Sequence, residues 1–156
     1  MSCVAARTGQ KVVLADLARD TDIDGKTADH WLSILVSSGL VYLLQPYFNN
    51  IIKRIIKRLK LYFMDTGLVC YLGLWNNPRG LELSDMVGTM FETFVISEII
   101  KSYASAGKDT RNHLCYYRDN NNCEIGLDVR NGCVLCVSSM SLPLDSKNRC
   151  IPVSCI

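Results

Sequence analysis

Four carboxylate side chains outline a possible metal-dependent site for cutting phosphodiester bonds. Glu124 and Asp128 lie on a strand-like segment, where they share one face with Gly126. Glu92 and Glu98 belong to a predicted long helix, on which they diverge by about 120°, so only one of them can join the strand acids. Such hydrolysis uses acids that bind a divalent cation and a lysine that assists the attacking water. The acids therefore still need a cationic partner.

The next predicted strand does not supply that partner. Residues 134–140 read VLCVSSM and contain neither an acid nor a lysine. We therefore expect at most two or three acids to converge without a cation, and we predict no catalytic residue, metal site or cofactor. Glu92, Glu98, Glu124 and Asp128 are interpreted as vestigial catalytic candidates. In the alternative interpretation, Glu124 and Asp128 are ordinary exposed strand acids.

Four cysteines near the C-terminus have a spacing that could form a zinc site. Cys133 and Cys136 are followed by Cys150 and Cys155, which could in principle give four thiolate ligands. The first pair, however, lies in an apolar strand-like run, where residues three apart point to opposite faces. We therefore disfavour a zinc site. We also expect reduced thiols in place of a disulfide framework, because cytosolic reductants keep cysteines from pairing.

Residues 25–27, Gly-Lys-Thr, end like a phosphate-binding loop. The full motif requires a glycine five positions before Gly25, where this chain has Asp20. Asp22 and Asp24 would also repel a phosphate at close range. Nucleotide binding is therefore rejected for this segment.

Basic side chains that could contact nucleic acid gather in two places, on the outer face of a predicted helix and in a cluster between positions 53 and 60. Each phosphate contact made by lysine or arginine releases counterions, so binding weakens as salt rises. The candidates are Lys26, Thr27, His30, Lys53, Arg54, Lys57, Arg58 and Lys60. The cluster could instead be a solvated face, or part of a cationic amphipathic helix on an anionic membrane surface.

Two short helices are expected to position the first of these groups. Leu14, Leu17 and Ala18 form the apolar face of one, and Asp24 can cap the next by accepting bonds from its free amides. The second helix, closed by Ser38-Gly39, has an apolar face of Ala28, Trp31, Leu32 and Leu35 and a polar face of Lys26, His30, Ser33 and Ser37. With the strand-like run at 40–44, this order is typical of a helix-turn-helix with a wing, or else of a helical hairpin in a core.

The remaining elements follow from periodicity and turn residues. Residues 51–59 have a cationic amphipathic pattern, and 60–65 alternate as a strand with Leu61 and Phe63 on one face. Residues 76–80 are the clearest loop and a candidate domain boundary. A long helix over 84–107 should end at Gly107. Its only continuous polar line is Thr89, Thr93, Ser97 and Lys101, so the rest of its surface should be mostly buried. Strand-like 113–118 and a hairpin around Asn131-Gly132 come last.

The bulk composition fits one folded unit or two very small ones. The 156 residues are 49% hydrophobic, enough for a packed core, and the formal net charge is only +2. The first twenty residues carry Arg7, Lys11 and Arg19 without a sustained apolar run, so we expect no signal peptide or membrane span and a cytoplasmic location.

As a set, these motifs resemble the C-terminal region of prokaryotic AAA+ type ATPases. The resemblance covers roughly residues 3–140. Its segments are AARTGQ at 5–10, HWLSILVSSGLVYLLQPY at 30–47, KLYFMDTGL at 60–68, GTMFETFVISEI at 88–99 and YYRDNNNCEIG at 116–126. In that family an ATPase module precedes a winged helix and a restriction-endonuclease-like domain. The resemblance implies these two folds and an ATPase partner.

The chain departs from the family at its catalytic-type positions. The resemblance places an acid where Gly126 stands and a Glu-x-Lys where 138–140 read Ser-Ser-Met, while Glu92, Glu98 and Glu124 keep the family character. Asp128 would have to replace the missing acid. A proline expected before Lys60 is Leu59 here. The ATPase module has no counterpart, so the chain resembles a fragment of such a protein.

We therefore predict an α/β fold of the α+β type, with a winged helix-turn-helix domain at 1–75 and a degenerate restriction-endonuclease-like domain at 76–156. The predicted function is that of a non-catalytic, DNA-binding or regulatory segment of an AAA+ type ATPase, not that of an enzyme. The alternatives are a metal-dependent DNA nuclease and a module that packs on an ATPase partner. The expected partners are DNA and an ATPase module or a second copy, with no membrane.

Overall fold

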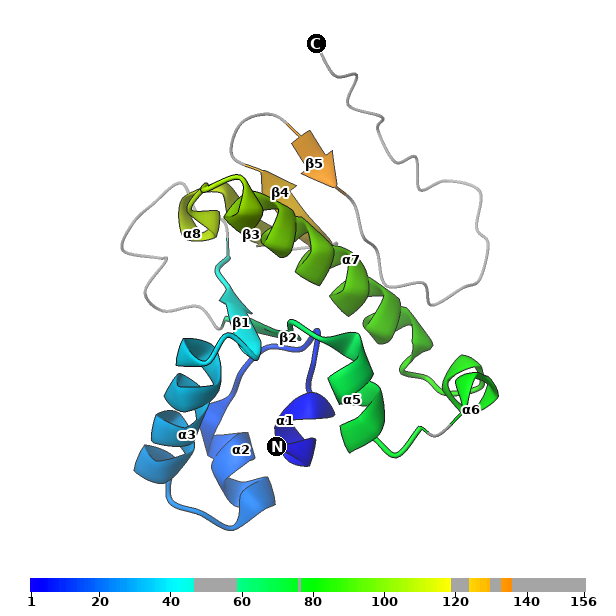
Figure 1. Ribbon diagram of the computed structural model, residues 1–156. Coiled ribbons are helices and arrows are strands. Elements are labelled where there is room, and N and C mark those ends of the chain that lie inside the picture. Colours follow the sequence, from blue (N-terminus) through cyan, green and yellow to red (C-terminus); the bar gives the residue numbers. More distant parts are fainter. Residues whose placement is uncertain (47–58, 76, 119–123, 130–132, 136–156) are drawn as a thin grey trace.

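The computed structural model describes residues 1–46, 59–75, 77–118, 124–129 and 133–135. Helices combine with small antiparallel sheets, which confirms the α+β class (Figure 1). The helices are α1 (Ser2–Ala5), α2 (Leu14–Thr21), α3 (Gly25–Ser37), α5 (Thr66–Leu72), α6 (Pro78–Glu82), α7 (Val87–Ser105) and α8 (Thr110–His113). The strands are β1 (Val41–Leu44), β2 (Lys60–Phe63), β3 (Leu114–Arg118), β4 (Glu124–Val129) and β5 (Cys133–Leu135).

The α2–α3 hairpin follows the predicted pattern. Helix α2 ends where Asp22 takes a left-handed conformation with φ 53°, and the Asp24 carboxylate caps α3 by accepting bonds from the amides of Lys26 and Thr27. Leu17, Ala18, Ala28, Leu32 and Leu35 are buried, as expected. Trp31 is an exception.

Trp31 was predicted to join the buried face of α3, but 58% of its surface is exposed. Its position lies about 70° from the centre of the face formed by Ala28, Leu32 and Leu35, at 100° per residue. Trp31 is therefore at the flank of the helix, where a side chain of this size reaches solvent.

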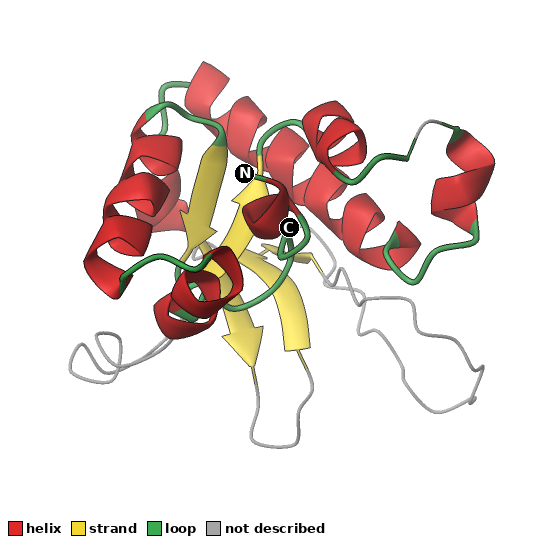
Figure 2. Ribbon diagram, turned by 90° about the horizontal axis from the view of Figure 1, so that it is seen from below, coloured by secondary structure: helices red, strands yellow, loops and turns green. Residues whose placement is uncertain are grey.

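Strand β2 lies at the centre of the N-terminal sheet. It pairs antiparallel with β1, with Val41 opposite Phe63 and Leu44 opposite Lys60. Residues 9–12 run along its other side, where Gly9 donates to the Leu61 carbonyl and Val12 to the Leu59 carbonyl. Figure 2 shows the strands in the middle of the molecule with helices around them.

The second sheet has the order β3-β4-β5, and all its neighbours are antiparallel. The β4–β5 pairing, with Val129 opposite Cys133, confirms the strands of the predicted C-terminal hairpin. The two sheets also meet, because the Tyr116 amide donates to the Gln45 carbonyl just beyond β1. The two sheets are therefore joined, and β3 lies next to the end of β1.

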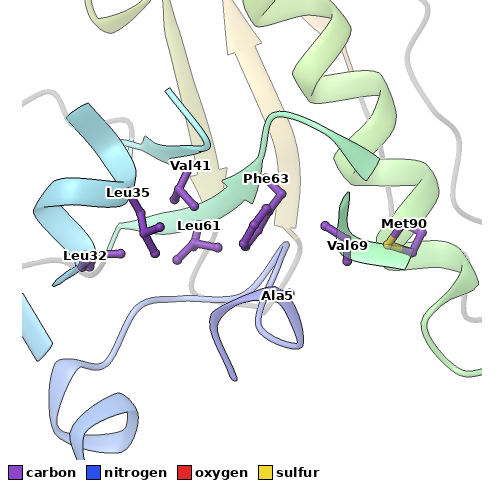
Figure 3. Close-up of a cluster of buried hydrophobic side chains, with 8 residues drawn as sticks. All are labelled: Ala5, Leu32, Leu35, Val41, Leu61, Phe63, Val69 and Met90. Carbon is purple, nitrogen blue, oxygen red and sulfur yellow. The ribbon is translucent and has the colours of Figure 1, made fainter. Parts of the chain in front are cut away.

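Two hydrophobic clusters fill the interior, and α7 contributes to both. The first contains Leu61, Phe63, Val69 and Met90 with residues of α1, α3 and β1 (Figure 3). The second contains Leu44, Tyr62, Ile96, Ile100, Leu114 and Tyr116. Each cluster thus joins residues from both sides of the predicted boundary at 75/76. The boundary itself stays a prediction, but the two parts share their core.

The segment at 76–80 was predicted to be a loop, and the structure corrects this from Pro78 onward. Pro78 opens α6, and the Asn77 side chain caps it by accepting a bond from the Gly80 amide. Proline suits the first turn of a helix because its missing N–H would be unsatisfied there anyway. Asn77 and Pro78, which are common in loops, therefore form the start of a helix here.

Helix α7 confirms the predicted long helix, and Gly107 follows it with φ 67°. Its faces mix polar and apolar residues, because buried Ile96 and Ile100 lie beside buried polar side chains. The polar residues Thr93 and Ser97 are buried, whereas Phe91 and Phe94 are 61% and 51% exposed. The predicted polar line therefore faces the core over these two positions.

Several predictions fall outside the described residues. They are the amphipathic pattern up to residue 58, including Lys53, Arg54, Lys57 and Arg58, the turn at Asn131-Gly132, and three of the four cysteines of the zinc pattern. Within the described parts of the chain, every helix is too short or too polar to cross a lipid bilayer.

Candidate functional site

A buried group of polar side chains lies where β2 packs against α7. Strand β2 alternates, so Leu61 and Phe63 enter the first hydrophobic cluster while Lys60 and Tyr62 occupy the other face. Glu92 lies on the buried side of α7 and meets them there. We call Lys60, Tyr62 and Glu92 the Lys60 cluster.

The Lys60 cluster is held by short, charge-assisted contacts. The Lys60 ammonium lies 3.2 Å from Glu92 Oε1, and the Tyr62 hydroxyl donates to the same oxygen at 2.6 Å. The ammonium also lies 5.9 and 5.8 Å from the ring centres of Tyr62 and Tyr116, within cation–π range. Lys60, Glu92 and Tyr62 are 6%, 5% and 0% exposed.

A series of hydroxyl groups continues this polar layer from Thr93, the residue after Glu92 on α7. The Phe63 amide donates to Thr8 Oγ1 at 3.3 Å, and the Thr8 and Thr93 hydroxyl oxygens are 3.0 Å apart. Thr93 donates to the Thr89 carbonyl at 2.8 Å. Because each hydroxyl has one proton, Thr8 must donate to Thr93. Each hydroxyl proton then has an acceptor, so these hydroxyl groups can be buried.

Gly9 explains how the N-terminal segment approaches α7 so closely. Its φ is +73°, and a Cβ built there would lie 2.8 Å from Thr89 Cγ2. Only glycine adopts this backbone conformation without strain and leaves room for the threonine. The glycine therefore brings Thr8 within reach of Thr93.

The Lys60 cluster is suited to fixing the fold more than to chemistry on a substrate. Taking two charges out of water is costly, and their attraction repays this only with good geometry and further hydrogen bonds. Here the carboxylate has an ammonium and a phenol as donors. Among the described residues, no three histidine, cysteine or acidic side chains gather as a metal-binding group.

The structure corrects one expectation about the predicted catalytic acids. Glu92 was expected to lack a cationic partner, yet it pairs with Lys60 from a strand 32 positions earlier in sequence. Glu98 lies on the exposed side of α7, where it pairs with Lys101 at 2.8 Å. Only one of the two helical acids therefore faces the interior.

The strand acids are described only by their backbone. Glu124 lies opposite Arg118 at one end of β4, and Asp128 lies opposite Cys115 at the other. The long helix α7 contacts β4.

The predicted nucleic-acid-binding residues occupy different environments. Lys26 and His30 are exposed on α3. Thr27 is partly buried, and its hydroxyl donates to Asp24. Lys60 was expected to meet phosphates, but its burial beside Glu92 removes it from that surface. Sequence reasoning missed this role, although the alternation of β2 already placed Lys60 beside Tyr62.

The rejected phosphate-loop pattern is explained by the cap of α3. The amides of Lys26 and Thr27, which a phosphate would need, already donate to the Asp24 carboxylate at 2.9 and 3.1 Å. The Thr27 hydroxyl and these amides hold the pKa of Asp24 below its usual value of 3.8. Thus Asp24 itself fills the anion position at this helix start.

Comparison with curated proteins gives relatives whose own roles are not described by their names. The chain is 33% identical over 121 residues to "Uncharacterized protein Rv2008c" of Mycobacterium tuberculosis and, at the same identity, to "Uncharacterized protein Mb2031c" of Mycobacterium bovis. The match covers 78% of this chain and 26% of each relative, so the chain spans about a quarter of their length. No solved structure matches.

Residues 1–81 match a family of domains. They run from α1 through the α2–α3 hairpin, β1, β2 and α5 into α6, and they include both Lys60 and the Thr8–Gly9 approach to α7. Since the match covers more than half of the chain, the protein belongs to the family described as "Domain of unknown function (DUF8612)".

Proposed function

We propose that this chain is a non-catalytic DNA-binding or regulatory segment that works with an AAA+ type ATPase. In this proposal residues 1–75 act as a winged helix-turn-helix and residues 76–156 as a degenerate restriction-endonuclease-like domain. The observation that carries it is the order of elements after α2. The capped helix α3 is followed by the antiparallel pair β1–β2, with residues 9–12 along the far side of β2. This order is typical of a winged helix.

The outer face of α3 supports a contact with a groove. Lys26, His30, Ser33 and Ser37 are exposed on it, and the Asp24 cap fixes the start of the helix. Side chains of these types reach phosphates and base edges when a helix enters the major groove.

The charge around α3 limits what this helix can contribute. Residues 14–37 contain five aspartates against Arg19 and Lys26. A net negative surface opposes contact with phosphates, so most of the affinity should come from the sequence cluster Lys53, Arg54, Lys57 and Arg58. That cluster connects β1 to β2, where a winged helix has its wing.

Burial of Glu92 supports a role without catalysis. A carboxylate that binds a catalytic cation must be open to water and to the phosphodiester. Glu92 is 5% exposed and is held by Lys60 and Tyr62. The association with an ATPase rests on the sequence resemblance, and the relatives, about four times longer than the matched region, have room for a further module.

DNA binding is tested by fluorescence anisotropy of a labelled duplex titrated with the whole chain at several salt concentrations. We expect the logarithm of the binding constant to fall linearly with the logarithm of salt concentration. Lys53→Ala with Lys57→Ala should reduce that slope by about one per lost contact, and Lys26→Ala with His30→Ala should have a smaller effect.

Arg79→Ala is the matched control, because it removes one exposed positive charge on α6, on the opposite side of the molecule from α3 (Figure 1). It should leave binding unchanged. Absence of binding at low salt, or binding that does not respond to salt, would reject the DNA-binding proposal.

A metal-dependent nuclease is the second candidate, favoured by the lysine beside Glu92. Incubation of plasmid DNA with the purified chain and Mg²⁺ or Mn²⁺ distinguishes the nuclease from the non-catalytic role. We expect no cutting. Cutting that is abolished by Glu124→Ala, with circular dichroism showing a folded chain, would establish the nuclease and reject the non-catalytic role.

A further inference from the structure

The solvent face of α7 carries an apolar stripe that the core does not use. Val87, Phe91 and Phe94 are 44%, 61% and 51% exposed and lie at i, i+4 and i+7, so they share one face of the helix. The opposite face is buried through Ile96 and Ile100. We call Val87, Phe91 and Phe94 the α7 stripe.

Aligned aromatic residues on a helix surface are a feature of interfaces. Single exposed apolar residues are ordinary, but contiguous ones mark contact sites, and phenylalanine is enriched there. Helix-binding interfaces use anchors at this same spacing. The α7 stripe therefore has the form of one half of a helix–helix contact.

Charges around the α7 stripe differ in net sign between its two ends. Glu82 and Asp85 are exposed before the helix begins, and no lysine or arginine occurs between Arg79 and Lys101. At or beyond its C-terminal end, the exposed bases Lys101, Lys108 and Arg111 outnumber the exposed acids Glu98 and Asp109. A parallel copy of this surface would oppose like charges, whereas an antiparallel copy would oppose unlike ones.

We propose that the α7 stripe packs antiparallel against the α7 stripe of a second copy of this chain. A two-fold axis between Phe91 and Phe94 places Phe91 opposite the partner's Phe94 and repeats the contact by symmetry. Continuing that register brings Lys101 close to the partner's Asp85. The positive N-terminal end of each helix dipole also meets the negative C-terminal end of the other.

This proposal goes beyond DNA binding, although a dimer would present two copies of α3 at a fixed separation, as helix-turn-helix dimers do. It stands on α7 alone. A chain that fails to bind DNA can still form this dimer, and a chain that binds DNA as a monomer would contradict only the dimer.

The test is sedimentation velocity of the whole chain over a series of protein concentrations at low salt. We expect a monomer–dimer equilibrium. Phe91→Asp should weaken it at least about thirtyfold, because a central aromatic anchor is buried on association. Tyr71→Asp is the matched control: Tyr71 is also a highly exposed aromatic, on α5, and its replacement should leave the equilibrium unchanged.

Charge reversal tests the antiparallel register. Asp85→Lys and Lys101→Glu should each weaken the dimer, and the two together should restore it. A monomer at every concentration would overturn the proposal and leave the α7 stripe to another module, such as an ATPase-type partner. A dimer that Phe91→Asp leaves intact, with circular dichroism showing a folded chain, would also overturn it.

Discussion

Two lysine–glutamate pairs involve helix α7, and they differ in environment more than in chemistry. Lys60 and Glu92 are 3.2 Å apart with side chains 8% and 7% exposed. Lys101 and Glu98 are 2.8 Å apart with side chains 48% and 51% exposed. The exposed pair is the shorter of the two, and it joins neighbouring positions on one helix. The buried pair instead joins β2 to α7 across the core.

The comparison shows that burial, and not distance, sets what each pair does. An exposed pair at i, i+3 gains little because water screens it and two flexible side chains must be ordered. An intact buried pair stabilises the fold little more than an apolar pair would. Removing one partner, however, leaves an unpaired charge in the low-dielectric interior. The Lys60 cluster should therefore specify how α7 packs on β2.

The largest expected effect is that of Glu92→Leu. This change removes the carboxylate that pairs with the Lys60 ammonium and accepts the hydrogen bond of the Tyr62 hydroxyl. We expect a loss of about 3 kcal/mol or more in the free energy of unfolding, measured with urea. Glu98→Leu is the control and should change it by about 0.5 kcal/mol or less. Equal losses in the two variants would remove the distinction between the pairs.

Gly9→Ala should be the next most damaging change, because Gly9 brings Thr8 against the buried side of α7. A methyl group there meets Thr89 and a backbone with φ +73°. We expect a loss of about 1–3 kcal/mol by urea unfolding. Gly39→Ala has the same φ with open space around it, so it reports backbone strain alone. If both variants lose the same free energy of unfolding, the contact between Gly9 and Thr89 contributes nothing to the loss in Gly9→Ala.

Thr93→Val tests the hydroxyl chain that extends the buried polar layer. The change keeps the shape of the side chain but leaves Thr8 without its acceptor on α7. The expected loss is about 1–2 kcal/mol in thermal or urea unfolding. Ser102→Ala removes a similar hydroxyl–carbonyl bond on the exposed side of α7 and should have almost no effect. A neutral Thr93→Val would show that the hydroxyls are not coupled.

The smallest expected effect is the acid dependence of the α3 cap, far from both pairs. The bonds from Thr27 and Lys26 lower the pKa of Asp24 in the folded state, so this contribution to stability is complete above the usual value of 3.8. It is lost as the pH falls through the lower folded-state pKa. Amide hydrogen exchange in the first turn of α3 should quicken over that range in the native chain. Asp24→Asn should show no such change, and identical profiles would contradict the cap.

Local signals predicted several elements. Asp24 was read as the cap of α3, Gly107 as the end of the long helix, and the alternation of β2 placed Leu61 and Phe63 on one face. Each depends on neighbours within a few positions, so the chain alone encodes it.

Other features depend on contacts between distant segments and were wrong or missed. Thr93 and Ser97 are buried because helix carbonyls and Thr8 satisfy their hydroxyls, so a polar line on α7 did not mark the solvent face. Lys60 was assigned to a basic surface because its neighbours in sequence are basic. Its partner Glu92 comes from a different element, which no local pattern reveals.

A double-mutant cycle on Lys60 and Glu92 tests the central claim most directly, namely that this buried pair joins β2 to α7. The variants are Lys60→Met, Glu92→Leu and both together, with the free energy of unfolding measured for each. We predict that the double variant loses less stability than the two single losses combined, by about 1–3 kcal/mol. Additive losses would show that the two charges do not depend on each other and would contradict the account.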